Sequence, residues 1–252
     1  MDKPAGPRTL ILDVETSPIE GYVWSLWKQN VGLNQIKTPS RVICFAAKWL
    51  GERSTLFFSE HEYRHEEMID AAYSLLDQAD VVMSFNGTQF DIPRLNGEFA
   101  LKHMAPYSPI KQIDLLVTAR KLFGFPSNKL EYLATVFGLG GKVNHNGMPL
   151  WLDCLAGDEK AWRLMRKYNK RDVTLLEELY AEYFQPWVVS HPSHAAFTGL
   201  TCCPACGSLD LMKRGFCYTS VSQYQQFQCQ KCGKYSRATH RERGVEITGV
   251  VL

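Results

Sequence analysis

The sequence predicts a mixed α/β domain, in which helices pack on a central sheet, followed by a small cysteine-rich domain. Short aliphatic and β-branched runs come first, and strand-like and helix-like segments then alternate. After Phe184 the composition changes to a Pro- and His-containing stretch and then to clustered cysteines. With 252 residues, of which 45% are hydrophobic and 21% charged, the chain can form one sizeable core and an appendage. We therefore expect domains over residues 1–190 and 199–252.

Four segments have the composition of buried strands. The first, residues 9–14 (TLILDV), has Pro and Arg before it and Thr-Ser-Pro shortly after it. The others are residues 41–49, 54–58 and 81–85. Residues 17–40 contain Trp24 and Trp27 without clear periodicity, which predicts a long excursion or lid between the first two strands.

Helical spacing of apolar residues marks the other elements. The clearest case is residues 159–184, a long amphipathic segment. Pro93 fits the first turn of a helix that runs toward His103. Residues 138–149 are rich in Gly and Asn, which predicts a loop. Further helices are expected over residues 64–79, 112–123 and 129–137.

The distribution of charge is more informative than its total. The formal net charge is +2, but from Gly199 onward seven basic residues stand against three acidic ones, and the remainder has 21 basic and 23 acidic residues. A basic tail suits contacts with phosphates, although a solvated surface would give the same balance. No apolar run is long enough for a signal peptide or a membrane span. We therefore expect an intracellular, cytoplasmic protein with no membrane partner and with reduced cysteines.

Acidic residues lie where elements begin or end, or on an apolar face. Asp13 and Glu15 are two apart at the end of a strand, so both side chains point to one face, and carboxylates that close need a cation or a shared proton. Asp91 opens a helix, where an N-cap is the ordinary role. Asp172 shares the apolar face of the long helix with Tyr168 and therefore needs a partner.

Together the four acids predict a metal site. Three separate segments supply them, and hard oxygen ligands suit Mg²⁺ or Mn²⁺. Two such ions, about 3.5–4 Å apart, would clamp the attacking and leaving oxygens of a phosphodiester. A turn or a helix cap remains the alternative for single acids.

The segments LILDVETSP, SFNGTQFDIPRL and YNKRDVTLLEEL resemble the three exonuclease motifs of the DEDD (DnaQ-like) superfamily, which has an RNase H-like fold. They look similar above all to the proofreading domains of family-B DNA polymerases and to stand-alone bacterial and phage relatives. The resemblance spans residues 8–184. Tyr168, rather than a histidine, precedes Asp172 in the third motif, and His145 lies outside the motif spacing. The resemblance therefore implies the Tyr subclass, acting in the host cytoplasm if a phage encodes the chain.

The resemblance implies a 3′→5′ exonuclease, a hydrolase that releases nucleoside 5′-monophosphates and uses two Mg²⁺ or Mn²⁺ ions. In that family pattern Asp13 bridges both ions, Glu15 and Asp172 complete the first, and Asp91 helps to hold the second. Tyr168 would position the attacking water.

Substrate contacts are also implied. Asn86 and Phe90 resemble motif residues that touch the terminal nucleotides, Thr16 would contact the 3′ end, and Lys142 the phosphates, although each can instead be structural. Single-stranded DNA is the expected substrate, and a polymerase or another replication protein is a candidate partner. The alternatives are an exoribonuclease, a non-catalytic nucleic-acid-binding adaptor and a structure-selective endonuclease.

The cysteine-rich segment predicts a zinc ribbon. Two Cys-x2-Cys pairs separated by 22 residues match a closed site for one structural Zn²⁺, whose ligands would be Cys203, Cys206, Cys229 and Cys232. Cys202 adjoins the first pair but lacks the spacing. So small a domain has too little core to stand alone without metal.

The residues around these cysteines add two expectations. Gly207 and Gly233 follow the two pairs and permit the tight turn that lets backbone amides face sulfur. Aromatic residues interleave with Lys and Arg in this cysteine-rich segment, which suits stacking on bases and contacts with phosphates; they are Phe216, Tyr218, Tyr224, Phe227 and Tyr235. A ribbon core or a protein-docking surface is the alternative.

Overall fold

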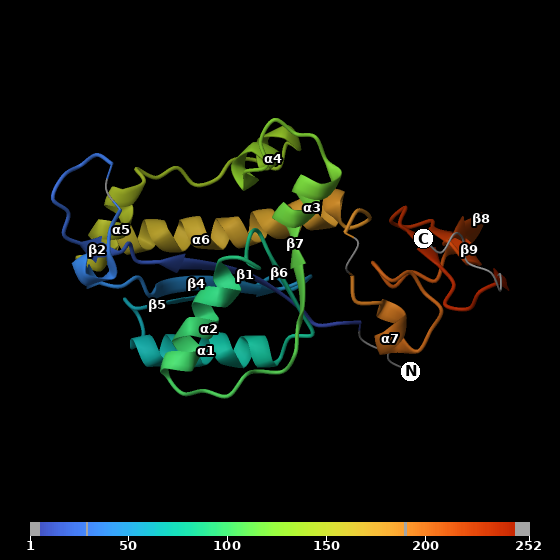
Figure 1. The fold of residues 1–252 in the computed structure, drawn as a ribbon, viewed down its shortest axis with the longest axis horizontal. Coiled ribbons are helices and arrows are strands. Elements are labelled where there is room, and N and C mark those ends of the chain that lie inside the picture. Colours follow the sequence, from blue (N-terminus) through green and yellow to red (C-terminus); the bar gives the residue numbers. More distant parts are fainter. Residues whose placement is uncertain (1–5, 29, 189–190, 245–252) are drawn as a thin grey trace, which may run out of the picture. The chain divides into compact units, whose positions relative to one another are not determined.

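The computed structural model describes residues 6–28, 30–188 and 191–244 (Figure 1). The chain divides into two compact units, Arg8–Leu179 and the combination of Met1–Pro7 with Tyr180–Leu252. Among the described residues, none of the helices has the length and apolar character needed to cross a membrane.

A five-stranded mixed sheet forms the centre of the unit Arg8–Leu179. Its order is β5-β4-β1-β6-β7, so β1 is the middle strand. β1 runs antiparallel to β4 and parallel to β6. The strands are β1 (Thr9–Thr16), β4 (Val42–Trp49), β5 (Leu56–Ser59), β6 (Val81–Ser84) and β7 (Lys111–Asp114). The mixed sheet predicted from the sequence is therefore confirmed.

Helices cover both faces of this sheet, α1 and α2 on one and α6 on the other (Figure 1). Leu12 of β1 packs in the cluster that contains α1 and α2. Because side chains alternate along a strand, Asp13 faces the opposite layer, where α6 lies. The helices are α1 (His65–Asp77), α2 (Asp91–Leu101), α3 (Leu115–Leu122), α4 (Leu130–Val136), α5 (Met148–Leu155) and α6 (Glu159–Leu179).

Three predicted elements differ from the structure. The helix expected over 112–123 begins only at Leu115, because Lys111–Asp114 pairs with β6 as β7. Asp114 ends that strand and caps the helix directly, so no turn residues separate the two elements. The loop expected over 138–149 ends earlier, since α5 starts after Gly147. The helix expected over 159–184 stops at Leu179 and continues as a π-helical turn, η2 (Tyr180–Phe184).

The excursion predicted between the first two strands is present and contains a small hairpin. Its elements are β2 (Glu20–Gly21), the 3₁₀ turn η1 (Leu33–Gln35) and β3 (Ile36–Thr38). At its base the N–H of Ser17 donates to the carbonyl oxygen of Arg41 at 2.8 Å, and the N–H of Arg41 donates to Ser17 Oγ at 3.1 Å. The two ends of the excursion are thus joined side by side.

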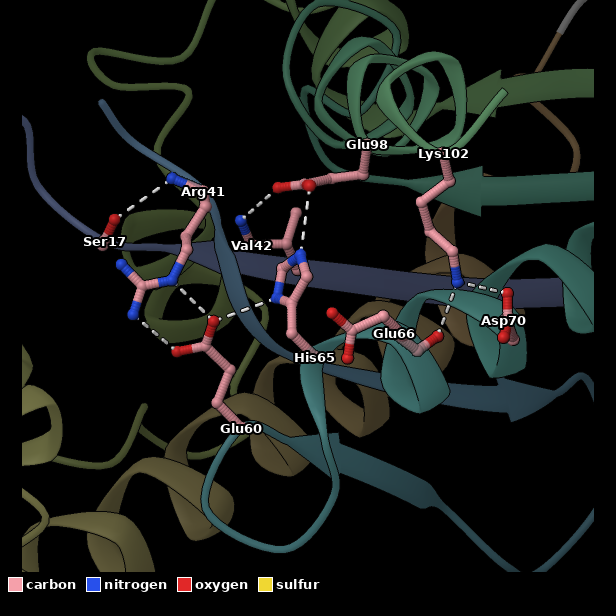
Figure 2. A network of polar contacts seen from close by, with 9 residues as sticks. All are labelled: Ser17, Arg41, Val42, Glu60, His65, Glu66, Asp70, Glu98 and Lys102. Carbon is pink, nitrogen blue, oxygen red and sulfur yellow. Dashed lines mark hydrogen bonds and ion pairs between the residues drawn. The ribbon is translucent and has the colours of Figure 1, made fainter. Parts of the chain in front are cut away.

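A polar network fixes this base to α1 and α2 (Figure 2). The Arg41 guanidinium donates two hydrogen bonds to Glu60, at 2.7 and 2.9 Å. The His65 ring lies between Glu60 at 3.0 Å and Glu98 at 3.1 Å. Glu98 also accepts the N–H of Val42 at 2.9 Å. Contact with Glu60 raises the pKa of His65 above its ordinary value.

The second unit contains η2, the short helix α7 (His194–Thr198) and a small antiparallel sheet. β9 (Ser222–Cys229) pairs with each of the other strands, β8 (Leu211–Tyr218), β10 (Tyr235–Arg237) and β11 (Arg243–Gly244). Its hydrophobic cluster is built on Cys203, Ala205 and Cys229. A core this small contributes little stability without further support, as expected of a ribbon held by a metal.

Candidate active site

The four acids that the sequence singled out line one cavity of about 540 Å³ in the unit Arg8–Leu179, and Glu131 of α4 lines it as a fifth acidic residue that was not predicted. Asp13 and Glu15 reach it from β1, Asp91 from the start of α2 and Asp172 from α6. Tyr168 lines the same cavity one helical turn before Asp172. The structure therefore brings together all five residues that the sequence singled out for catalysis.

Asp91 does not cap its own helix. Phe90 occupies the N-cap position, and Asp91 Oδ1 accepts the backbone N–H of Val14 at 2.7 Å. This bond ties α2 to β1 between its two acids. Burial raises the pKa of Asp91 to about 7, against the opposing effect of the Val14 N–H.

The loop before α2 passes close to this carboxylate. A Cβ atom at Gly87 would lie 2.2 Å from Ser84 Oγ and 3.1 Å from Asp91 Oδ2. Only glycine avoids that clash, so Gly87 permits the close approach. Asn86, beside it, has a φ of 72°. Its N–H donates to Asp114 at 2.9 Å, which holds the loop in place.

Asn169 holds Asp13, a role that the sequence did not reveal. Its Nδ2 donates to Asp13 Oδ2 at 2.6 Å and to the Asp13 carbonyl oxygen at 3.1 Å. Burial, and then the charges of Glu15 and Asp91, raise the pKa of Asp13 well above its usual value. Asn169 is fully buried and lies three residues before Asp172, on the same face of α6. A polar residue on the helix face that bears Asp172 was the feature of the sequence that could have indicated this role.

Asp172 is buried and only partly satisfied. Lys142 Nζ is paired with Asp172 Oδ2, and the Tyr168 hydroxyl also donates to this carboxylate. Burial nevertheless raises the pKa of Asp172. Asp172 Oδ1 is buried and has no hydrogen-bond partner. Because buried carboxylate oxygens are costly without a partner, this oxygen fits a site for a cation.

Glu15 is a second carboxylate at this cavity that requires a neutralising partner. Burial and the charges of Asp172 and Asp91 raise its pKa to about 8, while Trp151 gives it a hydrogen bond. In the described part of the chain, the four cysteines are the only group of three or more His, Cys, Asp or Glu residues whose ligand atoms lie close enough together to hold one metal ion. The carboxylates of Asp13, Glu15, Asp91 and Asp172 instead line a shared cavity. Their donor set fits hard divalent cations.

Tyr168 is held by aromatic neighbours. The His145 ring lies 4.7 Å from it and the Trp151 ring 6.1 Å, both edge-on. Burial, followed by the charges of Glu15 and Asp172, raises the pKa of Tyr168. The hydroxyl is thus kept protonated and can donate a hydrogen bond.

The predicted substrate-binding residues fall into two groups. Asn86, Phe90 and Lys142 line the cavity, whereas Thr16 is not among the described residues that do. Thr16 lies next to a register shift in the pairing of β1 with β4. Two further basic residues line the cavity without having been predicted, Arg120 and Lys129.

A family model described as RNase_H superfamily matches residues 32–184, more than half of the chain. The chain belongs to the RNase H superfamily. No curated protein matches it. The family B DNA polymerase of the hyperthermophilic archaeon Pyrobaculum calidifontis is similar in structure, with a TM-score of 0.55 and 16% identity. The match covers 73% of this RNase H superfamily chain and 25% of the polymerase, so the chain corresponds to about a quarter of that enzyme.

The second unit of the RNase H superfamily chain contains a four-cysteine cluster. The sulfurs of Cys203, Cys206, Cys229 and Cys232 all lie within 4.8 Å of one another. Two pairs are 3.6 Å apart, close to the roughly 3.8 Å that zinc–sulfur bonds of about 2.3 Å give in a tetrahedron. Cys202 is outside the cluster. The arrangement fits a closed zinc site.

The glycines after each cysteine pair have the conformation that the turns require. Gly207 has a φ of 70° and Gly233 one of 77°, both in the left-handed region. Backbone N–H groups of Ser208 and Lys234 then face the sulfurs of Cys206 and Cys232. Such contacts stabilise the thiolate form that binds metal.

Proposed function

We propose that this RNase H superfamily protein is a metal-dependent 3′→5′ exonuclease that hydrolyses terminal phosphodiesters of single-stranded DNA. The observation that carries the proposal is the convergence of Asp13, Glu15, Asp91 and Asp172 on one cavity, with an unpartnered oxygen on Asp172. The four carboxylates would hold two Mg²⁺ or Mn²⁺ ions. Bound divalent ions supply stabilisation of the negative charge that develops on the phosphoryl oxygens.

The protein's own side chains orient the reactants. The Tyr168 hydroxyl, directed by its bond to Asp172, would hold the attacking water. Asn169 keeps the Asp13 carboxylate in one orientation, because its amide donates both to the carboxylate and to the backbone of the same residue. Lys142 lines the cavity and would pair with a substrate phosphate.

The remaining cavity residues would receive the end of the strand. Phe90 and Asn86 would contact the terminal nucleotides. Thr16, which does not line the cavity but ends β1 beside it, would contact the 3′ end. The choice of DNA rests on similarity to the fold of a DNA polymerase, which by itself supports the fold only. A polymerase or another replication protein is the partner that this analogy favours.

We also propose that the domain spanning residues 199–252 binds one structural Zn²⁺ and nucleic acid. In this domain Arg237 lies 4.0 Å over the ring of Tyr224. Phe216 and Tyr218 of β8 are exposed beside Lys213 and Arg214. Exposed rings interleaved with cations suit bases and phosphates.

Digestion of end-labelled oligonucleotides tests the activity. Single-stranded DNA and RNA, labelled at the 5′ end, are incubated with Mg²⁺ or Mn²⁺, and the expected product pattern is a ladder shortened from the 3′ end. A 3′-phosphate should protect the strand. Cleavage of a closed circle would instead indicate an endonuclease. Preferential digestion of RNA would show that RNA, rather than DNA, is the substrate.

A further inference from the structure

The excursion between β1 and β4, residues 18–40, exposes large aromatic side chains. Trp24 is 95% exposed and Trp27 is 82% exposed, and Tyr22 is exposed on the same segment. Indole rings are among the side chains that gain most from burial, so two of them left in water indicate a surface that another molecule covers. None of these residues belongs to the cavity described above.

The charge of the excursion favours the binding of a polyanion. Its one acidic residue, Glu20, is compensated by Lys37 Nζ at 3.0 Å and by the Thr38 hydroxyl at 2.9 Å. Lys28 is exposed and has no ion-pair partner among the residues that the structure describes. A strand of phosphates would therefore meet no unpaired negative charge along this segment.

The aromatic segment is attached directly to the strand that bears two of the acids. β1 carries Asp13 and Glu15 into the cavity and ends at Thr16, and the excursion follows at once (Figure 1). A cavity of about 540 Å³ has room only for the terminal nucleotides, so the rest of a bound strand must lie outside it. A surface anchored at the end of β1 is available to those nucleotides.

The excursion is anchored and partly ordered by its own hydrogen bonds. Ser17 and Arg41 join its two ends, and Arg41 is held in turn by Glu60 (Figure 2). Within it, the N–H of Tyr22 donates to the Gln35 carbonyl oxygen at 2.9 Å, and Gln35 Nε2 donates back to the Tyr22 carbonyl oxygen at 2.9 Å. Trp24 and Trp27 lie in the loop that this hairpin closes, between Tyr22 and Gln35.

We propose that the excursion is a stacking platform for single-stranded nucleic acid, on which bases upstream of the 3′ end lie against Trp24 and Trp27. This inference rests on the proposed function and specifies the path of its substrate. Every base has a face that can stack on an aromatic ring, so the contact would tolerate any sequence. An apolar protein surface would instead use the exposed aliphatic neighbours, such as Leu33, as well as the rings.

Binding of a fluorescent single strand tests the platform. The full chain carrying Asp172→Asn, which prevents degradation, is titrated into a 5′-labelled oligonucleotide and followed by fluorescence anisotropy. In that background Trp24→Ala and Trp27→Ala should each raise the Kd about 5- to 100-fold, and Trp24→Phe should retain most of the affinity. Leu33→Ala is the matched control, since it removes an 88% exposed apolar side chain from the same excursion without removing a ring.

Abasic strands separate stacking from other contacts. An oligonucleotide that keeps its phosphates but lacks bases at successive positions from the 3′ end should bind more weakly at the positions over the platform. At those positions Trp24→Ala should cost no further affinity, because the ring has already lost its partner. Removing a base and substituting Trp24 each lower the affinity. The position at which these two losses are no longer additive is the position of the platform along the strand.

Three results would overturn the inference. These are unchanged affinity of both tryptophan variants, an equal loss from Leu33→Ala, and a Trp24→Ala effect that persists on a fully abasic strand. A change in oligomeric state caused by Trp24→Ala would assign the surface to a second copy of the chain. Binding is measured without cleavage, so the two proposals can fail separately. The tryptophans can prove to bind single strands even if no exonuclease activity is found, and the activity can be found even if the tryptophan variants bind normally.

Discussion

The carboxylate of Asp91 accepts the backbone N–H of Val14 at 2.7 Å, and this one bond connects the start of α2 to the strand between Asp13 and Glu15. It fixes acids from two segments that are far apart in the sequence at the same cavity. It also explains why Asp91 is buried although it begins a helix. A capping carboxylate would accept N–H groups at the start of its own helix, whereas the Asp91 carboxylate accepts an N–H of β1.

Neutralising one acid should stop hydrolysis without unfolding the protein. We expect Asp13→Ala or Asp172→Asn to lower the turnover number by about three orders of magnitude or more, as loss of a metal ligand does. Because the buried carboxylates repel one another, the thermal midpoint without added divalent ion should be unchanged or higher. Asp153→Asn, on an exposed position of α5, is the control. Near-normal turnover in either active-site variant would refute the assignment.

Removing the Tyr168 hydroxyl should slow the reaction while metal binding persists. Tyr168→Phe is expected to reduce the rate by about 10- to 10⁴-fold, the range for a positioned proton-handling group. Calorimetric titration with Mn²⁺ should show unchanged binding. Tyr73→Phe, whose ring packs edge-on against Phe99 in the core, serves as the comparison. An unaltered rate for Tyr168→Phe would leave this tyrosine a purely structural role.

The cysteine cluster should bind one zinc ion per chain. Elemental analysis of protein purified without chelator should give a ratio close to one, and Cys203→Ser or Cys229→Ser should abolish it, since each removes one of four ligands. Cys202→Ser should leave the zinc content unchanged because its sulfur lies outside the cluster. Protein that contains no zinc would contradict the prediction.

The ribbon should contribute affinity rather than chemistry. Four thiolates leave zinc no open position, so it cannot activate water. A chain that ends at residue 194 should therefore keep its rate at saturating substrate, bind oligonucleotide more weakly, and show a shallower dependence of binding on salt. If the shortened chain binds and cuts as well as the whole, the ribbon contacts a protein partner instead. Loss of turnover in a folded shortened chain would mean that it takes part in the active site.

The stability contributed by His65 should depend on pH. Its folded-state pKa is raised above 6.5, first by its contact with Glu60, so its contribution is fully present below pH 6.5 and is lost as pH rises through the folded pKa. We expect His65→Gln to lower the free energy of unfolding by about 0.5–1 kcal/mol more at pH 6 than at pH 9. Urea titrations at both pH values measure this difference. The exposed His240→Gln controls for loss of an imidazole, and a pH-independent His65 effect would contradict the ion-pair account.

Local patterns were sufficient for much of this protein. The aliphatic and β-branched run of residues 9–14 predicted a strand, and the two-residue period of a strand placed Asp13 and Glu15 on one face. Helical spacing predicted that Tyr168 and Asp172 are neighbours, and they share a hydrogen bond. The spacing of the cysteine pairs predicted the cluster in the same way, because short turns determine which sulfurs can meet.

Tertiary packing decided what those patterns left open. β7 forms because Gln112 and Ile113 pair with β6, a partner some 30 residues away that no local periodicity reveals. Asp172 is paired with Lys142 of the loop before α5, and Asp13 accepts a hydrogen bond from Asn169 of α6, which packs on the sheet. Such contacts depend on which buried groups are left unsatisfied once the layers close, and burial costs are determined by the whole fold rather than by neighbours in sequence. The sequence by itself therefore determined which acids face which side of their elements, while only the closed α/β core determined what holds each of them at the cavity.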